Sequence, residues 1–217
     1  MFGRKKIAML VAEFLGTGVL TLVVLAVSKS TIGIPYFVAI AAGLVLVAMT
    51  LALGAVSGAQ LNPAITLGLW TVRKVKTVPA LAYVAAQLAG GYAAYWLYTY
   101  FIGQTWANAT GKFEAKILIA EAVGALIFSI AWAAAAYQRL EVGKAATVVG
   151  VGLMLGAIVA SSVSYGLLNP AVALGVRSFS WVYVLGPILG AIIGFNIYGF
   201  LFAPYANAKD EAAKKKK

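Results

Sequence analysis

Hydrophobic residues run along most of the chain, and polar residues interrupt them at fairly regular intervals. Six apolar runs are long enough for membrane-spanning helices, since about 20 helical residues cross the hydrocarbon core of a bilayer. Two shorter runs follow the second and fifth long runs, and a helix of about ten residues reaches only halfway across. The long runs are 7–27, 34–55, 77–101, 116–137, 145–164 and 180–203, and the short runs are 62–71 and 169–177.

The composition supports this interpretation. Hydrophobic residues make up 63% of the 217 residues and charged residues 11%, about half the charged fraction of an average soluble domain. No charge lies between Lys29 and Arg73. The first run is too long for the core of a signal peptide, so we expect it to be retained. We predict an all-α membrane protein with six transmembrane helices and two half-helices.

The basic residues predict the orientation of these helices. Cytoplasmic segments of membrane proteins carry an excess of lysine and arginine. This rule predicts that both termini lie in the cytoplasm, and it assigns the net charge of +11 to topology and not to nucleic-acid binding. We expect an integral protein of the cell (plasma) membrane. The predicted cytoplasmic residues are Arg4, Lys5, Lys6, Arg73, Lys74, Lys76, Arg139, Lys144, Lys209 and Lys214 to Lys217, and the predicted outer ones are Lys29, Lys112, Lys116 and Arg177.

Conventional enzyme chemistry has few residues to work with. The chain has no cysteine, no histidine and only six acidic residues. Disulfides and thiolate or imidazole metal sites are therefore excluded, and a nucleophilic triad would lack its usual base. We expect no enzyme activity, no metal and no cofactor.

Two similar strings at corresponding places indicate an internal duplication. Asn62 and Asn169 lie 107 positions apart, and "AEFLG" at 12–16 is echoed by "AEAVG" at 120–124. Each repeat crosses the membrane three times, which is an odd number, so the second copy must have the inverted topology. Broken hydrophobic segments in two inverted halves point to a transport site. We therefore expect a first repeat at 1–108, a second at 109–204 and a basic cytoplasmic tail at 205–217.

Each repeat contains an Asn-Pro-Ala string, formed by Asn62, Pro63 and Ala64 and by Asn169, Pro170 and Ala171. Asparagine is favoured at a helix N-cap and proline at the first helical position. Each string therefore predicts a loop followed by a half-helix. Inversion brings the two N-termini together near the middle of the membrane, where their dipoles repel cations and interrupt a proton wire.

The loop before each string predicts a row of carbonyl oxygens along a pore. Non-helical backbone at this depth must be buried in protein or line a wet cavity. The residues expected to supply the carbonyls are Gly58, Ala59 and Gln60 in the first copy, and Tyr165, Gly166 and Leu167 in the second.

Glu13 and Glu121 are acidic residues within membrane-spanning runs, where such residues usually have a function. We expect each carboxylate to accept hydrogen bonds from the loop of its own repeat, with Gln87 supporting a loop as well. Proton relay is the alternative reading, but no other titratable group continues a relay.

The chain resembles the aquaporin, or major intrinsic protein, family. The resemblance rests on "AEFLGT", "SGAQLNPAITLG", "AAQLAGG", "AEAVG", the second "NPA" and "WVYVLGPILGA", which spread over nearly the whole chain. It implies a right-handed bundle with an inverted three-helix repeat. It also implies a homotetramer with one pore per subunit, and passive flux of water or small uncharged solutes across the lipid bilayer.

The resemblance also implies a selectivity constriction of four positions. Three of them correspond to Ala42, Gly166 and Val172, and the position on the fifth long helix corresponds to Val159 by one alignment and to Ala157 by another. The family nearly always has arginine where this chain has Val172. Without an aromatic ring, a histidine or a guanidinium, the constriction should be wider and less polar, which favours glycerol-like solutes and possible passage of ammonia or gases.

Two alternative functions remain open. A secondary transporter would use Glu13 or Glu121 as its coupling site. A non-conducting structural protein could keep the fold, with Tyr165 or Trp181 plugging the pore. Arg177 reads as an interfacial charge rather than a pore residue, and 108–110 fits a glycosylation pattern that is frequent by chance.

Overall fold

The computed structural model describes residues 3–31, 33–109 and 113–205. This part of the chain forms eight α-helices and one π-helical segment, and it contains no strand. Lys112, Thr110 and the predicted tail beyond residue 205 lie outside the described residues. The elements are α1 (Arg4–Ser28), α2 (Pro35–Ser57), α3 (Pro63–Thr71), α4 (Thr77–Ile102), α5 (Ala115–Tyr137), α6 (Val142–Ala160), α7 (Pro170–Gly175), α8 (Trp181–Ile197) and η1 (Tyr198–Phe202).

The predicted segments correspond to the observed helices one by one, including the two half-helices α3 and α7. Five helical stretches are long and apolar enough to cross a membrane: α1, α2, α5, α6 and the stretch of α8 and η1 up to Tyr205. Helix α4 is 26 residues long but is not among them, because its tyrosines and Gln87 lower its mean hydropathy. The fold is nevertheless the predicted all-α membrane architecture.

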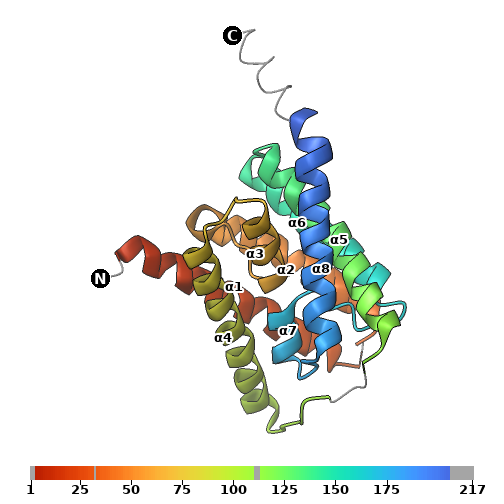
Figure 1. The fold of residues 1–217 in the computed structure, drawn as a ribbon. Coiled ribbons are helices and arrows are strands. Elements are labelled where there is room, and N and C mark those ends of the chain that lie inside the picture. Colours follow the sequence, from red (N-terminus) through yellow and green to blue (C-terminus); the bar gives the residue numbers. More distant parts are fainter. Residues whose placement is uncertain (1–2, 32, 110–112, 206–217) are drawn as a thin grey trace.

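The two halves of the chain are arranged alike (Figure 1). Helix α1 packs against α2 and α4 in the first half, and α5 packs against α6 and α8 in the second. Helices α2 and α6 join the halves. Each half-helix packs against a long helix of the other half, α3 against α8 and α7 against α4. The half-helices are therefore enclosed by the long helices.

Close helix approaches at glycine hold this arrangement together. A Cβ atom on Gly91 of α4 would collide with the carbonyl oxygen of Ala171 at the start of α7. A Cβ atom on Gly190 of α8 would collide with the carbonyl oxygen of Ala122 in α5. Small residues at such interfaces let helices pack backbone to backbone, as is common within membranes.

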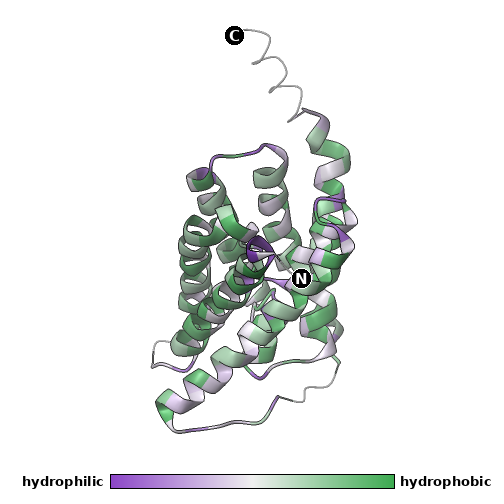
Figure 2. Cartoon of the chain, turned by 90° about the vertical axis from the view of Figure 1, so that its left-hand side faces the viewer, coloured by the Kyte–Doolittle hydropathy of each residue, from purple (hydrophilic) through white to green (hydrophobic). Residues whose placement is uncertain are grey.

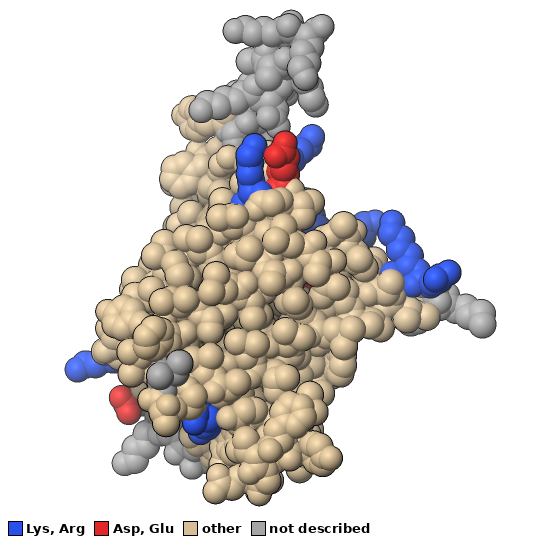
Figure 3. Space-filling model, turned by 180° about the vertical axis from the view of Figure 1, so that it is seen from behind, with Lys and Arg blue, Asp and Glu red and all other residues tan. Residues whose placement is uncertain are grey.

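The surface has the pattern of a protein embedded in lipid. Hydrophobic colour predominates on most of the long helices, and the strongest hydrophilic colour lies mostly in the connecting segments (Figure 2). Charged side chains gather near the edges of the face shown in Figure 3 and leave its broad middle uncharged. Large apolar side chains such as Leu44 and Ile119 are more than half exposed. Together with the apolar helices, this surface identifies an integral membrane protein.

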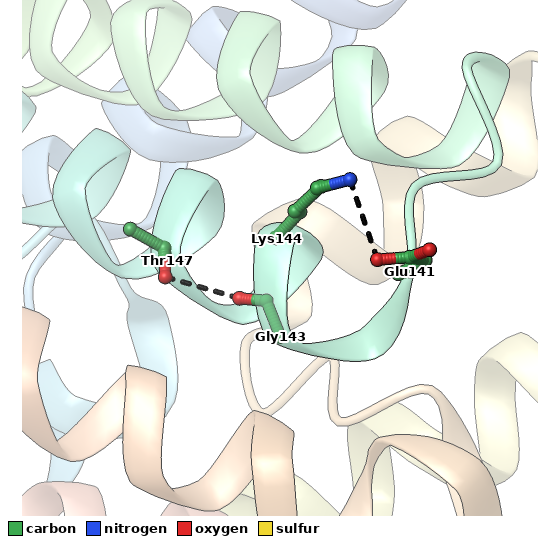
Figure 4. Close-up of polar contacts among 4 residues, drawn as sticks. All are labelled: Glu141, Gly143, Lys144 and Thr147. Carbon is green, nitrogen blue, oxygen red and sulfur yellow. Dashed lines mark hydrogen bonds and ion pairs between the residues drawn. The ribbon is translucent and has the colours of Figure 1, made fainter.

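The bundle has two ends, which the connecting segments define. At the terminal end, α1 begins, α8 ends and α5 connects to α6. The opposite end holds the α1–α2 connection and the segment after α4. At the terminal end Glu141 precedes α6, and its carboxylate lies 3.3 Å from Lys144 Nζ (Figure 4). These side chains are 81% and 70% exposed, so the ion pair adds little stability.

Candidate functional site

The two Asn-Pro-Ala strings start the half-helices α3 and α7. Asn62 Oδ1 accepts a hydrogen bond from the backbone N–H of Ala64 at 2.8 Å. Asn169 Oδ1 accepts bonds from Ala171 N–H at 3.0 Å and from Val172 N–H at 3.4 Å. Each asparagine thus caps its helix, and a proline follows at the first helical position. The local chemistry expected from the sequence is present in both copies.

The two caps are also joined to each other across the centre of the bundle. Asn62 Nδ2 donates to the carbonyl oxygen of Leu168 at 2.8 Å, and Asn169 Nδ2 donates to that of Leu61 at 2.9 Å. Both asparagines are 2% exposed. A side-chain amide carries two N–H donors, so each asparagine retains one donor that these bonds do not use. Asn169 lines a cavity at this point.

Glu13 holds the first loop. Its Oε1 accepts from Ser57 Oγ at 2.6 Å and from Gln60 N–H at 3.0 Å. Its Oε2 accepts from Leu61 N–H at 2.7 Å and from Gln87 Nε2 at 2.8 Å. Glu13 and Gln87 are fully buried. The expected hydrogen bonds between this carboxylate and the loop are therefore present, and Gln87 contacts the carboxylate itself.

Glu121 holds the second loop in the same way. Its Oε1 accepts from Ser164 Oγ at 2.7 Å and from Leu167 N–H at 3.0 Å, and its Oε2 accepts from Leu168 N–H at 2.7 Å. Serine precedes the loop in both copies, and the carboxylate binds the two N–H groups just before each capping asparagine. The duplication seen in the sequence is thus repeated in the hydrogen bonds.

These bonds fix the direction of the loop carbonyls. In a trans peptide the C=O and the following N–H point in opposite directions, and no peptide bond among the described residues is cis. The N–H groups of residues 59–61 point to Ser57 and Glu13, and those of 166–168 point to Ser164 and Glu121. The carbonyls facing away from these anchors belong to Gly58, Ala59, Gln60, Tyr165, Gly166 and Leu167.

A narrow cavity adjoins the second loop. It is lined by Ala42, Ala157, Gly166 and Val172, together with Asn169 and neighbouring apolar side chains. We call it the constriction cavity. The volume that the centre of a water molecule can occupy in this cavity is about 20 Å³. This is close to the roughly 10–15 Å³ that one water needs. Three of the four predicted constriction residues, Ala42, Gly166 and Val172, therefore lie together.

The prediction that Val159 is the fourth constriction residue is wrong. Val159 is 45% exposed and lies in a shallow groove between α5 and α6 on the outside of the bundle. Ala157 is 3% exposed and lines the constriction cavity. Residues two positions apart on a helix are separated by about 200° around its axis, so the side chains of Ala157 and Val159 lie on nearly opposite faces. The second loop packs directly on α6 at Ala157, because a Cβ on Gly166 would lie 2.6 Å from the carbonyl oxygen of Ala157. This contact supports Ala157 as the constriction residue of α6.

Arg177 does not replace the missing arginine at Val172. Helix α7 ends at Gly175, and Arg177 follows in a left-handed conformation with φ of 61°. Its side chain lines a separate chamber and is absent from the lining of the constriction cavity. The guanidinium carbon lies 5.0 Å from the ring centroid of Tyr95. Among the described residues, none that lines the constriction cavity carries a positive charge.

Two larger chambers lie on either side of this narrow region. The Trp106 chamber, at the opposite end, has a volume of about 420 Å³ and is lined by Lys29, Trp106, Tyr165 and Arg177 among others. The Trp132 chamber, at the terminal end, has a volume of about 230 Å³ and includes Thr50, Gly58 and Trp132 in its lining. The loops and half-helices separate the two chambers.

Sequence reasoning missed Trp132 and Thr50 as lining residues. Trp132 Nε1 and Thr50 Oγ1 are buried and have no hydrogen-bond partner within the described residues. Thr50 is the single serine or threonine of the run 34–55, and this isolated polar position was the signal available.

Tyr165 stands at the boundary between the constriction cavity and the Trp106 chamber and lines both. Its ring stacks on that of Tyr183 with centroids 5.6 Å apart and planes inclined by 7°. Its backbone N–H donates to Tyr183 Oη at 3.2 Å. The ring is therefore held against α8.

Comparison with known proteins agrees with this geometry. The family model for the major intrinsic protein family matches residues 4–198. Aquaporin Z of Photorhabdus laumondii is 33% identical, with 89% of this chain and 97% of that protein covered. Aquaporin AqpM of Methanothermobacter thermautotrophicus is 31% identical, with 76% of each covered.

A solved structure shares the fold. The X-ray structure of the aquaglyceroporin from Plasmodium falciparum superposes with a TM-score of 0.78 at 21% identity, covering 94% of this chain and 99% of that one. The family match over nearly the whole helical region, with relatives above 30% identity, establishes the family. The chain belongs to the major intrinsic protein family, whose members are membrane channels and not enzymes.

Proposed function

We propose that this channel passes water and small uncharged solutes of glycerol size, and that it discriminates weakly between them. The observation that carries the proposal is the lining of the constriction cavity by Ala42, Ala157, Gly166 and Val172. No ring, imidazole or guanidinium from these four positions narrows the path or donates to the permeating molecule. The apolar wall suits the carbon side of a small polyol, ammonia or a dissolved gas as well as water.

The loops supply a path for the polar side of the solute. Six carbonyls that face away from Glu13 and Glu121 accept hydrogen bonds, and Asn62 and Asn169 each have one free N–H to donate. A hydroxyl solute can exchange these partners in single file. Because the interactions replace those lost on leaving water, desolvation costs the solute little.

We propose that ions and protons are excluded at the two asparagines. The N-termini of α3 and α7 meet there, which gives a positive potential that repels cations. A water molecule that accepts from both amides has its hydrogens directed away from the centre, and this orientation interrupts a proton wire. Anions are stopped by the apolar constriction, since burying an unpaired charge there is costly.

The alternative of a secondary transporter receives no support from the acids. All oxygens of Glu13 and Glu121 accept hydrogen bonds from their loops, both residues are fully buried, and neither lines the cavities described above. A plugged, non-conducting pore is also disfavoured, because Tyr165 is held against Tyr183 and Trp181 is 71% exposed.

We further propose a homotetramer in the cell membrane, with one pore per subunit and both termini in the cytoplasm. The exposed apolar side chains on α1, α2, α5 and α6 leave faces for lipid or neighbouring subunits; examples are Leu15, Leu44, Leu51, Ile119 and Leu155. The excess of basic residues at the terminal end favours the proposed orientation.

Flux measurements in proteoliposomes test the function. Vesicles that contain the protein should shrink and reswell faster than protein-free vesicles when water or glycerol gradients are applied. The transporter alternative predicts saturable, proton-dependent uptake instead. Water and glycerol flux no greater than in protein-free vesicles would refute the proposal.

A further inference from the structure

Two basic side chains line the Trp106 chamber without an acidic partner. Lys29 and Arg177 both contribute to the chamber. Among the residues that the structure describes, the single ion pair is the one between Lys144 and Glu141 at the other end of the bundle (Figure 4). Neither cation of the chamber is therefore paired directly with a carboxylate, and the nearby Glu121 is occupied by its bonds to Ser164 and Leu167. The concave, low-dielectric wall strengthens the field of the two cations.

Two hydrogen-bond donors on residues that line the chamber are also unused. Trp106 Nε1 and Arg177 Nε are both buried, and neither has a partner within the described part of the chain. An indole N–H can only donate, and so can a guanidinium. Buried polar groups are normally paired. The missing partner must therefore be an acceptor, and beside two cations an anionic acceptor is favoured.

Aromatic rings hold the cations in place. Lys29 Nζ lies 4.7 Å from the ring centroid of Trp106, and Arg177 Cζ lies 5.0 Å from that of Tyr95. The rings of Tyr95 and Trp106 meet edge to face with centroids 5.3 Å apart. Cation–π contacts place the charges but neutralise neither, so both remain available to an anion.

The segment that carries Trp106 is fastened to the chamber. Asn108 Nδ2 donates to the carbonyl oxygen of Phe179 at 2.9 Å, and Phe179 N–H donates to Asn108 Oδ1 at 3.0 Å. Tyr95 Oη donates to the carbonyl oxygen of Trp106 at 3.2 Å. The hydrogen bonds of Asn108 also argue against its glycosylation. The donors are thus preorganised, which lowers the entropic cost of binding.

We propose that the Trp106 chamber binds a small monovalent anion, held by Lys29, Arg177 and the indole N–H of Trp106. This proposal does not rest on the proposed function, since it concerns the binding of an anion and not the flux of a solute. The chamber shares Tyr165 and Leu167 with the constriction cavity, so a bound anion stands at the mouth of the pore. The anion does not pass into the constriction cavity, because no described residue that lines this cavity carries a positive charge to stabilise it.

Iodide quenching of tryptophan fluorescence tests the proposal on the purified full-length protein in a neutral detergent. Iodide is a monovalent anion that quenches indole on contact, and potassium gluconate keeps the ionic strength constant. We expect a saturable component of the quenching that Trp106→Phe removes. The double variant Lys29→Gln with Arg177→Gly should raise the half-saturating iodide concentration by about tenfold or more. Glycine suits the left-handed conformation at position 177.

Lys144→Gln is the matched control, because it removes a cation at the terminal end and should leave the saturable component unchanged. Acrylamide, a neutral quencher, should quench the parent, the double variant and Lys144→Gln alike when they are folded, because all three keep every tryptophan, and this separates loss of the site from loss of the fold. Quenching that rises linearly with iodide in the parent, or a saturable component that survives the double variant, would overturn the proposal. Competition by anionic lipid but not by chloride would do so too, because the site would then belong to a lipid headgroup.

Discussion

Replacement of Glu13 by glutamine tests how the first loop is held. Glutamine keeps the length of the side chain but exchanges one acceptor oxygen for an NH₂ donor. The remaining oxygen can still accept from Ser57 and Gln60. Gln87 can turn its own amide to accept from the new NH₂ group. The backbone N–H of Leu61, now 2.7 Å from Oε2, cannot turn and is left facing a donor.

The cost follows from these changes. A buried N–H without an acceptor costs about 1–3 kcal/mol, and two charge-assisted bonds that become neutral lose about 1 kcal/mol each. Removal of the buried charge returns part of this, since a neutral amide is less costly to bury. We expect Glu13→Gln to destabilise the protein by about 2–3 kcal/mol, or about 5–10 °C in melting temperature.

Thermal unfolding in detergent measures this shift, with Glu13→Ala as a more severe variant that loses all four bonds. In proteoliposomes, the displaced loop should lower water and glycerol flux together. Unchanged thermal stability of Glu13→Gln would refute the loop-holding role. Selective loss of proton-dependent uptake, with stability preserved, would instead favour the transporter alternative.

Two further substitutions probe the pore. Ala157→Phe should fill the constriction cavity and lower glycerol flux at least about tenfold, whereas Val159→Phe, on the outer face, should leave flux near the parent value; equal effects of the two in stopped-flow measurements would contradict the placement of Ala157. Asn62→Asp keeps the cap on Ala64 but loses the donor to Leu168 and puts a negative charge where the helix N-termini meet. We expect a cation conductance absent from the parent in planar bilayers, and unaltered ion exclusion would count against the dipole argument.

Much of the fold follows from local rules that the sequence displays openly. Long uncharged runs have the length of a bilayer core, and asparagine before proline marks a helix start. The residues at 62–64 and 169–171 therefore identify the half-helices from the sequence. The loop-facing role expected for Glu13 and Glu121 follows from the scarcity of other partners within the membrane.

The register of α6 could not be predicted in the same way. Matching short apolar strings favoured Val159, and counting back from Asn169 favoured Ala157. The choice depends on the turn at 161–164 and on the close approach of Gly166 to the Ala157 backbone, which are tertiary features. An apolar helix carries little amphipathic signal to say which face lines a pore.

The Trp106 chamber was also beyond sequence reasoning. Its walls come from segments far apart in the chain, with Lys29 after α1, Trp106 after α4 and Arg177 after α7. The interfacial charge expected at Arg177 gave no indication that its Nε atom would be buried without a partner.

The ratio of glycerol to water permeability, measured in the same proteoliposomes for the parent and for Val172→Arg, tests the central claim most directly. The account predicts that the parent passes both solutes. It also predicts that an arginine at position 172 narrows the constriction and lowers glycerol permeability more than water permeability. A parent that excludes glycerol, or a variant that reduces both permeabilities equally, would contradict the claim that the small, uncharged constriction determines what the channel passes.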